Sequence, residues 1–162
     1  LLRESQAKAC SDIPELYFAS AIDVGDGSDI HPFDKKSVGY RLSRIAISEV
    51  YHREGIVPNG PVYNGYCCEG SAIRVFFRHG EGLHFRGGTP KHFYVMGRQN
   101  TFFPADQVII DGKTILVSSK EVPAPLAVRY SWANNPNGNL YNGAELPAGP
   151  FRTDYCDNVR GW

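Results

Sequence analysis

The segment Asp29-Ile30-His31-Pro32 contains the residue types of a general base catalyst. In extended backbone, side chains two positions apart project to the same side. The Asp29 carboxylate could therefore approach the His31 ring and fix its tautomer while Ile30 packs inward. Such a histidine can take a proton from a serine hydroxyl that attacks an ester carbonyl and return it to the leaving alcohol. Alternatively, the two side chains only satisfy backbone groups where a helix begins.

The elements that must position this segment are read from the hydrophobic pattern around it. Residues 1–8 resemble the tail of a helix, and residues 16–23 (LYFASAID) predict a buried parallel strand. After a polar loop, apolar residues recur every three to four positions over residues 35–52, which predicts a helix capped by Asp34. A strand, loop and helix in this order are typical of the closing unit of an α/β sheet, whose loops bind ligands.

The pattern changes at about Pro58, where Gly, Pro and Asn begin to divide the chain into short alternating segments. The pair Asp111-Gly112 is a strong hairpin signal. We expect two domains, an α/β part over 1–57 and an all-β sandwich over 58–162. The predicted strands cover residues 62–69, 72–79, 92–97, 107–110, 114–118 and 126–132.

Charge and motifs exclude several classes of function. Lysine plus arginine and aspartate plus glutamate both number 17, so the formal net charge is zero and no basic stripe suits nucleic acid. The apolar runs are too short to span a bilayer. Gly25 and Gly27 lie in no phosphate-binding motif, and the cysteines lack zinc-ligand spacing. We therefore expect no cofactor and no metal.

The four cysteines, Cys10, Cys67, Cys68 and Cys156, favour disulfides formed in an oxidising compartment. Cys67 and Cys68 should lie in one strand with their side chains on opposite faces, so each is expected to bond elsewhere. Buried free thiols are the alternative, and four cysteines allow three complete pairings.

Three blocks of the sequence resemble the sialate O-acetylesterase family of the SGNH hydrolases. The segment AIDVGDGSDIHP (residues 21–32), followed by a lysine at 35 or 36 and by Val38-Gly39 and Arg41-Leu42, is similar to the last conserved block of that family. LRESQ (residues 2–6) resembles the helix that precedes it. Near the end, VRYSWANNP, NLYN and LPAGPFRTD (residues 128–136, 139–142 and 146–154) resemble its C-terminal signature.

The resemblance implies a serine esterase on a flavodoxin-like α/β/α core that removes acetyl groups from sugar hydroxyls, with 9-O-acetylated sialic acid as the expected substrate. His31 would be the catalytic base. In the family the serine nucleophile and the oxyanion-hole Gly and Asn lie on upstream blocks, and this chain has no counterpart. We therefore expect the chain to be the C-terminal part of a longer enzyme or the smaller chain of a processed one. Its expected partner is an N-terminal segment that carries the serine.

The acid that orients His31 is open at this point. SGNH enzymes commonly place it three residues before the histidine, where this chain has Ser28. Asp29 is our choice, with Asp26, Asp23 or a backbone carbonyl in reserve.

Two alternatives to an esterase stay open. The β unit could be a carbohydrate-binding module with an inert loop, or the chain could be a structural relative without activity. Trp132, Tyr130 and Tyr141 could stack on a sugar or fill the core, and Arg129 and Arg152 could bind a sugar carboxylate or form salt bridges. The substrate-binding residues are therefore unknown. Proteolytic processing would suit a lysosomal or secreted glycoprotein, although the chain has no N-x-[ST] site.

Overall fold

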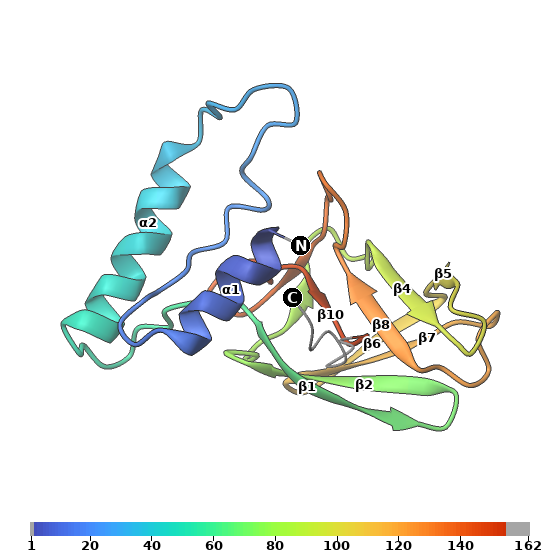
Figure 1. The fold of residues 1–162 in the computed structure, drawn as a ribbon. Coiled ribbons are helices and arrows are strands. Elements are labelled where there is room, and N and C mark those ends of the chain that lie inside the picture. The colour runs from blue at the N-terminus through green and yellow to red at the C-terminus, as the bar shows by residue number, and fades with distance from the viewer. Residues whose placement is uncertain (1, 155–162) are drawn as a thin grey trace.

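The computed structural model describes residues 2–154, in which a helical part stands beside a β-sandwich (Figure 1). The helical part (residues 2–57) contains helix α1, Leu2–Asp12, and helix α2, Lys35–Ile45. Helix α2 continues as a π-helical turn, η1, over Ala46–Val50. Both predicted helices are confirmed. Within residues 2–154, neither the length nor the apolar character of any helix suffices for crossing a lipid bilayer.

The sandwich (residues 62–152) contains the six strands that the sequence predicts and four that it does not. The unpredicted strands β3, β5, β9 and β10 are two or three residues long, too short for an alternating pattern to show. The strands are β1 Val62–Glu69, β2 Ala72–Arg78, β3 His84–Phe85, β4 Phe93–Met96, β5 Phe102–Pro104, β6 Gln107–Asp111, β7 Thr114–Ser118, β8 Ala127–Tyr130, β9 Leu140–Tyr141 and β10 Phe151–Arg152.

The strands form two four-stranded antiparallel sheets, in the orders β1-β2-β7-β6 and β10-β8-β4-β5, and a small β3-β9 sheet. Alternation directs every second side chain inward, so that Ile73 of β2 pairs with Val117 of β7 in one sheet. In the other, Val95 of β4 pairs with Val128 of β8. These four side chains are fully buried in one hydrophobic cluster shared by both sheets. The cluster is the core of the sandwich.

The hairpin predicted at Asp111-Gly112 is confirmed. Asp111 pairs with Thr114 across the β6–β7 turn, and Gly112 has a φ of +59°, a conformation in which a side chain would be strained.

The segment between the two helices departs from the prediction. Residues 16–21 have no regular secondary structure and residues 22–24 form a turn, so the strand predicted over 16–23 is wrong for this chain. Strands are stabilised by backbone hydrogen bonds to a neighbouring strand, and no strand of the described residues pairs with this segment. The α/β/α core and the division between residues 57 and 58 stay predictions.

The cysteines in the described residues are free thiols, contrary to the expected disulfides. Cys67 and Cys68 are neighbours in β1, as predicted, and their side chains have separate partners. The Cys68 thiol lies 3.6 Å from the carbonyl oxygen of Pro125, and the Cys67 thiol lies 3.6 Å from a Glu69 carboxylate oxygen. Cys10 is also free. Cys156 lies outside the described residues, so a pairing with it stays a prediction.

Candidate active site

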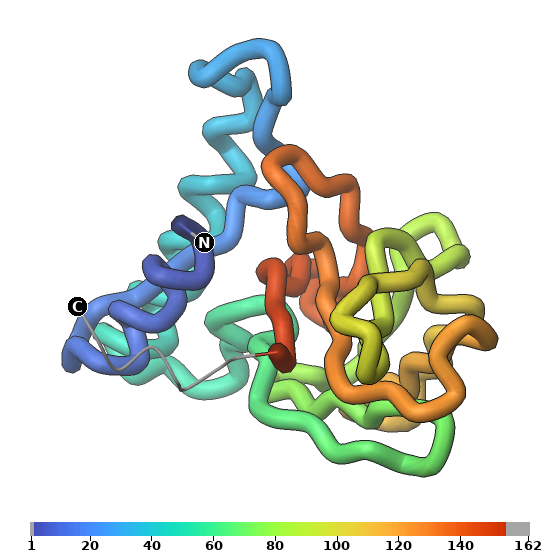
Figure 2. Tube along the Cα trace, turned by 45° about the vertical axis from the view of Figure 1, so that its right-hand side comes forward, coloured from blue at the N-terminus to red at the C-terminus, as the bar shows by residue number. Residues whose placement is uncertain are grey.

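The loop that carries His31 (residues 24–34) forms the projecting tip between the two helices (Figures 1 and 2). Short polar contacts shape it. The backbone and hydroxyl of Ser28 donate to Asp26 at 2.8 and 2.6 Å, and those of Ser37 donate to Asp34 at 2.9 and 2.6 Å. The second pair is the predicted cap of α2. These hydrogen bonds hold the pKa of both carboxyl groups below the usual value.

Asp29 and His31 lie on the same side of the loop, as expected. The backbone N–H of His31 donates to Oδ1 of Asp29 at 2.7 Å, and Nδ1 of the His31 ring lies 3.6 Å from the same oxygen. The His31 side chain is 80% exposed and that of Asp29 46% exposed. The carboxylate is therefore adjacent to the ring but just beyond hydrogen-bond distance, and the free edge of the imidazole faces outward.

Ile30 does not pack inward, which corrects the expectation. Its side chain is 90% exposed, and that of Phe33 is 96% exposed. The loop projects so far from the helical part that none of the described residues covers these two side chains. Two large apolar groups therefore flank the imidazole at the tip.

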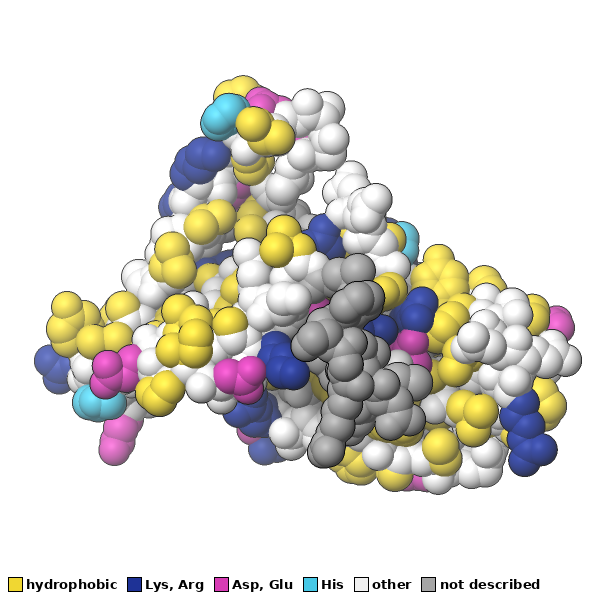
Figure 3. All heavy atoms as spheres, in the orientation of Figure 1, with side chains coloured by type: hydrophobic (Ala, Val, Ile, Leu, Met, Phe, Trp, Pro, Cys, Tyr) yellow, Lys and Arg dark blue, Asp and Glu magenta, His cyan; other side chains and the backbone are white. Residues whose placement is uncertain are grey.

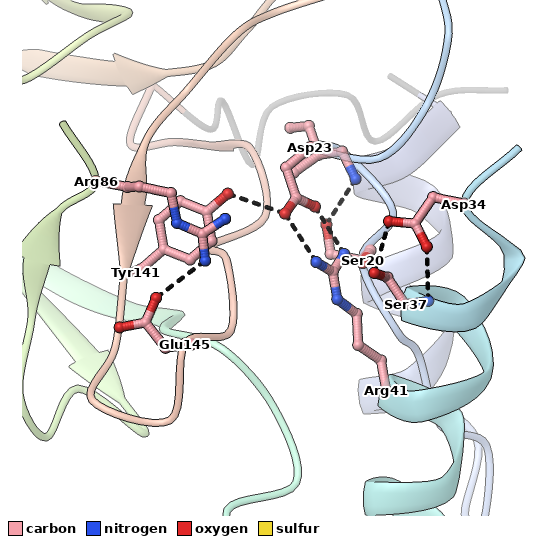
Figure 4. Close-up of polar contacts among 9 residues, drawn as sticks. Ser20, Asp23, Asp34, Ser37, Arg41, Arg86, Tyr141 and Glu145 are labelled. Carbon is pink, nitrogen blue, oxygen red and sulfur yellow. Dashed lines mark hydrogen bonds and ion pairs between the residues drawn. The ribbon is translucent and has the colours of Figure 1, made fainter. Parts of the chain in front are cut away.

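Asp23, a reserve candidate for the orienting acid, is bound elsewhere (Figure 4). Its two carboxylate oxygens accept hydrogen bonds from Arg41 of α2, both at 2.7 Å, and Oδ2 also accepts from the Tyr141 hydroxyl at 2.9 Å. We call these three side chains the clasp. Burial alone would raise the pKa of Asp23, but the hydrogen bonds from Arg41 and Tyr141 lower it below the usual value. Of the three candidate carboxylates, Asp29 is the one placed against His31.

The aromatic candidates for sugar stacking fall into two groups. Tyr130 and Tyr141 are buried, which assigns them to the packing of the sandwich and the clasp. Trp132 is partly exposed, and the guanidinium carbon of Arg152 lies 5.0 Å from its ring centroid.

The two arginine candidates make ion pairs within the chain. Arg129 pairs with Asp154 at 2.5 Å, and Arg152 pairs with Glu4 of α1 at 2.7 Å. The second pair connects the helical part to the sandwich.

A cavity of about 840 Å³ lies between the helical part and the sandwich, away from the His31 loop. It is bounded by α1, by residues 13–20 and by the sandwich side chains Tyr63, Arg78 and Trp132. In residues 2–154, no group of three His, Cys, Asp or Glu side chains is arranged to bind a metal ion.

Sequence reasoning did not anticipate the clasp. Arg41 and Tyr141 both lie in blocks that carry the family resemblance, but nothing in either block indicates that the two bind the same carboxylate. Asp23 and Tyr141 are 118 positions apart, and only the fold brings them together.

Comparisons with known proteins find likenesses among solved structures. The chain matches no model of a known protein family and no curated protein. Among solved structures it is similar to the crystal structure of a novel carbohydrate acetylesterase from Xanthomonas citri, with 40% identity and a TM-score of 0.88. The match covers 96% of this chain and 36% of that protein, so the chain spans little more than a third of its length. The chain therefore shares the fold of part of a carbohydrate acetylesterase.

Proposed function

We propose that this chain supplies the catalytic histidine, His31, of a serine-type carbohydrate O-acetylesterase. The observation that carries the proposal is an exposed imidazole, beside a carboxylate, on a loop in a chain 40% identical to part of a carbohydrate acetylesterase. The serine nucleophile is provided by an upstream segment or a separate processed chain, which we call the serine-bearing segment.

The proposed reaction proceeds through an acetyl-enzyme. Neutral His31 accepts the proton of the serine hydroxyl as the serine oxygen attacks the acetyl carbonyl carbon. The bond from that carbon to the sugar oxygen then breaks, and the sugar oxygen takes the proton from His31. In the second half, His31 accepts a proton from water as the water oxygen attacks the acetyl-serine carbonyl. The serine oxygen takes that proton as its bond to the acetyl carbon breaks, and acetic acid leaves and ionises to acetate in solution.

Asp29 is assigned the orienting role because its carboxylate is the one nearest the ring. The 3.6 Å gap to Nδ1 suits a carboxylate that tightens onto the ring when imidazolium forms, since catalytic hydrogen bonds are often long in the free enzyme. The Asp29→Asn variant is therefore expected to lose far less turnover than His31→Ala, measured as kcat on one acetylated substrate. Equal losses would instead indicate a full triad in which Asp29 is essential.

The helical part offers a surface for the serine-bearing segment. Large apolar side chains gather over the helices and at the tip (Figure 3). The surface of a monomeric protein rarely exposes so many large apolar side chains together, and such patches mark interaction sites. A sheet edge on the segment would also give residues 16–23 the strand partner that the described chain lacks. The exposed side chains are Ile13, Leu16, Tyr17, Ile30, Phe33, Tyr40, Leu42, Ile47, Val50 and Tyr51.

The substrate proposed in particular is 9-O-acetylated sialic acid, on the basis of the family resemblance, with action in a lysosomal or secreted setting. Acetate release from 9-O-acetylated sialic acid and from acetylated xylan, measured side by side on the intact esterase, tests this choice. Preference for xylan would reject the sialate assignment while retaining the esterase.

The decisive variant for the esterase itself is His31→Ala, compared with His52→Asn as a matched control. His52 is an exposed histidine outside the loop with a φ of +51°, which asparagine tolerates well. We expect His31→Ala to lower kcat by at least about a thousandfold, because removal of the base disables the serine. His52→Asn should stay within about twofold of the wild type. Undiminished turnover in His31→Ala would reject the proposed role.

A carbohydrate-binding module without catalytic activity is the second candidate, favoured by the cavity beside Tyr63 and Trp132. Aromatic rings at an open cavity can stack on sugar faces. This candidate predicts glycan binding that survives His31→Ala and disappears in Trp132→Ala, with no acetate release by the intact protein. Calorimetric titration with unacetylated oligosaccharides measures that binding.

A further inference from the structure

The clasp joins three elements that are distant in sequence. Asp23 immediately precedes the His31 loop, Arg41 lies in the helix that follows it, and Tyr141 belongs to β9 of the sandwich. Figure 4 shows the Asp23 carboxylate between the other two side chains. Arg41 also donates to the backbone oxygen of Ser20 at 2.6 Å. The two ends of the loop are thus tied to each other and to the sandwich through one carboxylate.

The sandwich holds Tyr141 rigidly. The residue is buried, and its strand pairs with β3 through His84. The guanidinium carbon of Arg86 lies 3.7 Å from the Tyr141 ring centroid, and Arg86 is itself paired with Glu145 at 3.0 Å (Figure 4). Burial, and then the charge of Asp23, raises the pKa of Tyr141, so its hydroxyl stays protonated as a donor. The hydroxyl is therefore a fixed point from which Asp23 is held.

A second contact brings the sandwich close to the loop nearer to its tip. Gly27 packs so tightly that a Cβ there would lie 2.4 Å from the side-chain nitrogen of Asn135. Asn135 follows β8 in the turn-rich segment of the sandwich. The sandwich therefore contacts the chain just before the loop, at Asp23, and contacts the loop itself at Gly27, four residues before His31.

The form of the clasp indicates a role in positioning. The side chains of Asp23 and Arg41 are each only 9% exposed, and taking both charges out of water offsets much of their attraction. A well-packed apolar pair in place of these two side chains would often stabilise the fold to the same degree. The two parallel hydrogen bonds of an arginine fork, however, define an orientation that apolar contacts do not.

We propose that Tyr141 is a positioning residue for His31, acting through Asp23 and Arg41 so that the sandwich sets where the catalytic loop stands. The inference rests on the proposed function in that His31 is taken to be the base. It assigns the sandwich a part in catalysis that is separate from binding sugar.

The test compares Tyr141→Phe with Tyr94→Phe in the intact esterase. Tyr94 is a partly exposed tyrosine of β4 whose hydroxyl bonds to no other described residue, so the control removes the same atom from the same sandwich. We expect Tyr141→Phe to lower kcat by about 5- to 50-fold with KM within twofold, since misplacing a catalytic group by about 1 Å costs up to about 100-fold. Tyr94→Phe should match the wild type.

Hydrogen exchange provides a readout that does not depend on activity. Amides of residues 24–33 should exchange at least several times faster in Tyr141→Phe, while those of β2 and β7 keep wild-type rates. Arg41→Lys, which keeps the charge but loses the fork, should show the same pattern.

Wild-type exchange in the loop of Tyr141→Phe would overturn the inference, whether or not kcat falls. Faster loop exchange with normal kcat would also overturn it. If instead His31→Ala keeps full activity, the proposed function fails on separate grounds.

Discussion

The sandwich and the helical part bury their apolar side chains to very different degrees. All the members of the hydrophobic core cluster lie in the sandwich, between Ile73 and Phe151. Helix α1 has no buried residue, and α2 buries only Arg41 and Ile45. The sandwich thus has its own hydrophobic core, whereas the helical part contacts it through polar groups such as the clasp and the Glu4–Arg152 pair. The His31 loop belongs to the helical part, which buries few of its own side chains.

The largest expected effect is a difference in stability between two Phe→Ala substitutions, one in the sandwich core and one at the exposed tip. Phe93→Ala in the sandwich core should lower the free energy of unfolding of this chain by about 3–5 kcal/mol, because it leaves a cavity among close-packed side chains. Phe33→Ala at the exposed tip should change it by less than about 0.5 kcal/mol. Urea unfolding followed by circular dichroism measures both. Similar losses for the two variants would contradict the contrast between the regions.

Next in size is the effect of weakening the clasp. Asp23→Asn should cost about 2–3 kcal/mol, because Arg41 is left buried without its counter-charge, although the amide keeps one acceptor. The matched control Asp12→Asn, at an exposed position at the end of α1, should stay within about 0.5 kcal/mol. The same urea titration measures both variants. An unchanged free energy of unfolding in Asp23→Asn would show that the clasp contributes nothing to stability.

A smaller effect is expected when the pH is lowered and the stability contributed by Asp23 decreases. The pKa of Asp23 is lower in the folded chain than in the unfolded chain, so the stability it contributes is fully present above the unfolded-state pKa of about 4. That stability is lost as the pH falls through the lower, folded-state value. The difference in unfolding free energy between wild type and Asp23→Asn should therefore be constant from pH 7 to about 5 and shrink in more acidic solution. A difference that grows on acidification would have the wrong sign.

The smallest effect on this chain alone is expected for the exposed apolar face of the helical part. Leu42→Glu should leave the unfolding free energy within about 0.5 kcal/mol, since Leu42 is half exposed. The substitution should nevertheless abolish association with the serine-bearing segment, because it places a charge in an apolar contact. Sedimentation velocity of the mixed components measures the association. Unchanged association would locate the contact elsewhere.

The sandwich was largely predictable because each of its longer strands is specified locally. Strands such as β1 and β7 are short runs rich in aromatic or β-branched residues between clear turn signals, and their predicted bounds match those observed. The helix after the loop and its Asp34 cap were predictable for the same reason. Strands of two residues, such as β9, depend on a partner distant in sequence and leave no local signal.

The predictions around the site were less accurate because they depended on what surrounds the loop. Residues 16–23 have the composition of a buried strand, but a strand needs a neighbour that the described chain does not provide. Ile30 was expected to pack inward because it alternates with Asp29 and His31, but the described chain has nothing at the tip for it to pack against. The proximity of Asp29 to His31 could be foreseen from their spacing, since it requires only local backbone geometry. The binding of Asp23 by Arg41 and Tyr141 could not be foreseen.

The most direct test of the central claim is covalent labelling of the intact esterase by a fluorophosphonate, which reacts with serines activated by a base. We predict that wild type and His52→Asn are labelled on a serine outside this chain and that His31→Ala is labelled at least about a hundred times more slowly. Equal labelling rates in His31→Ala and wild type, or no labelled serine in the wild type, would contradict it.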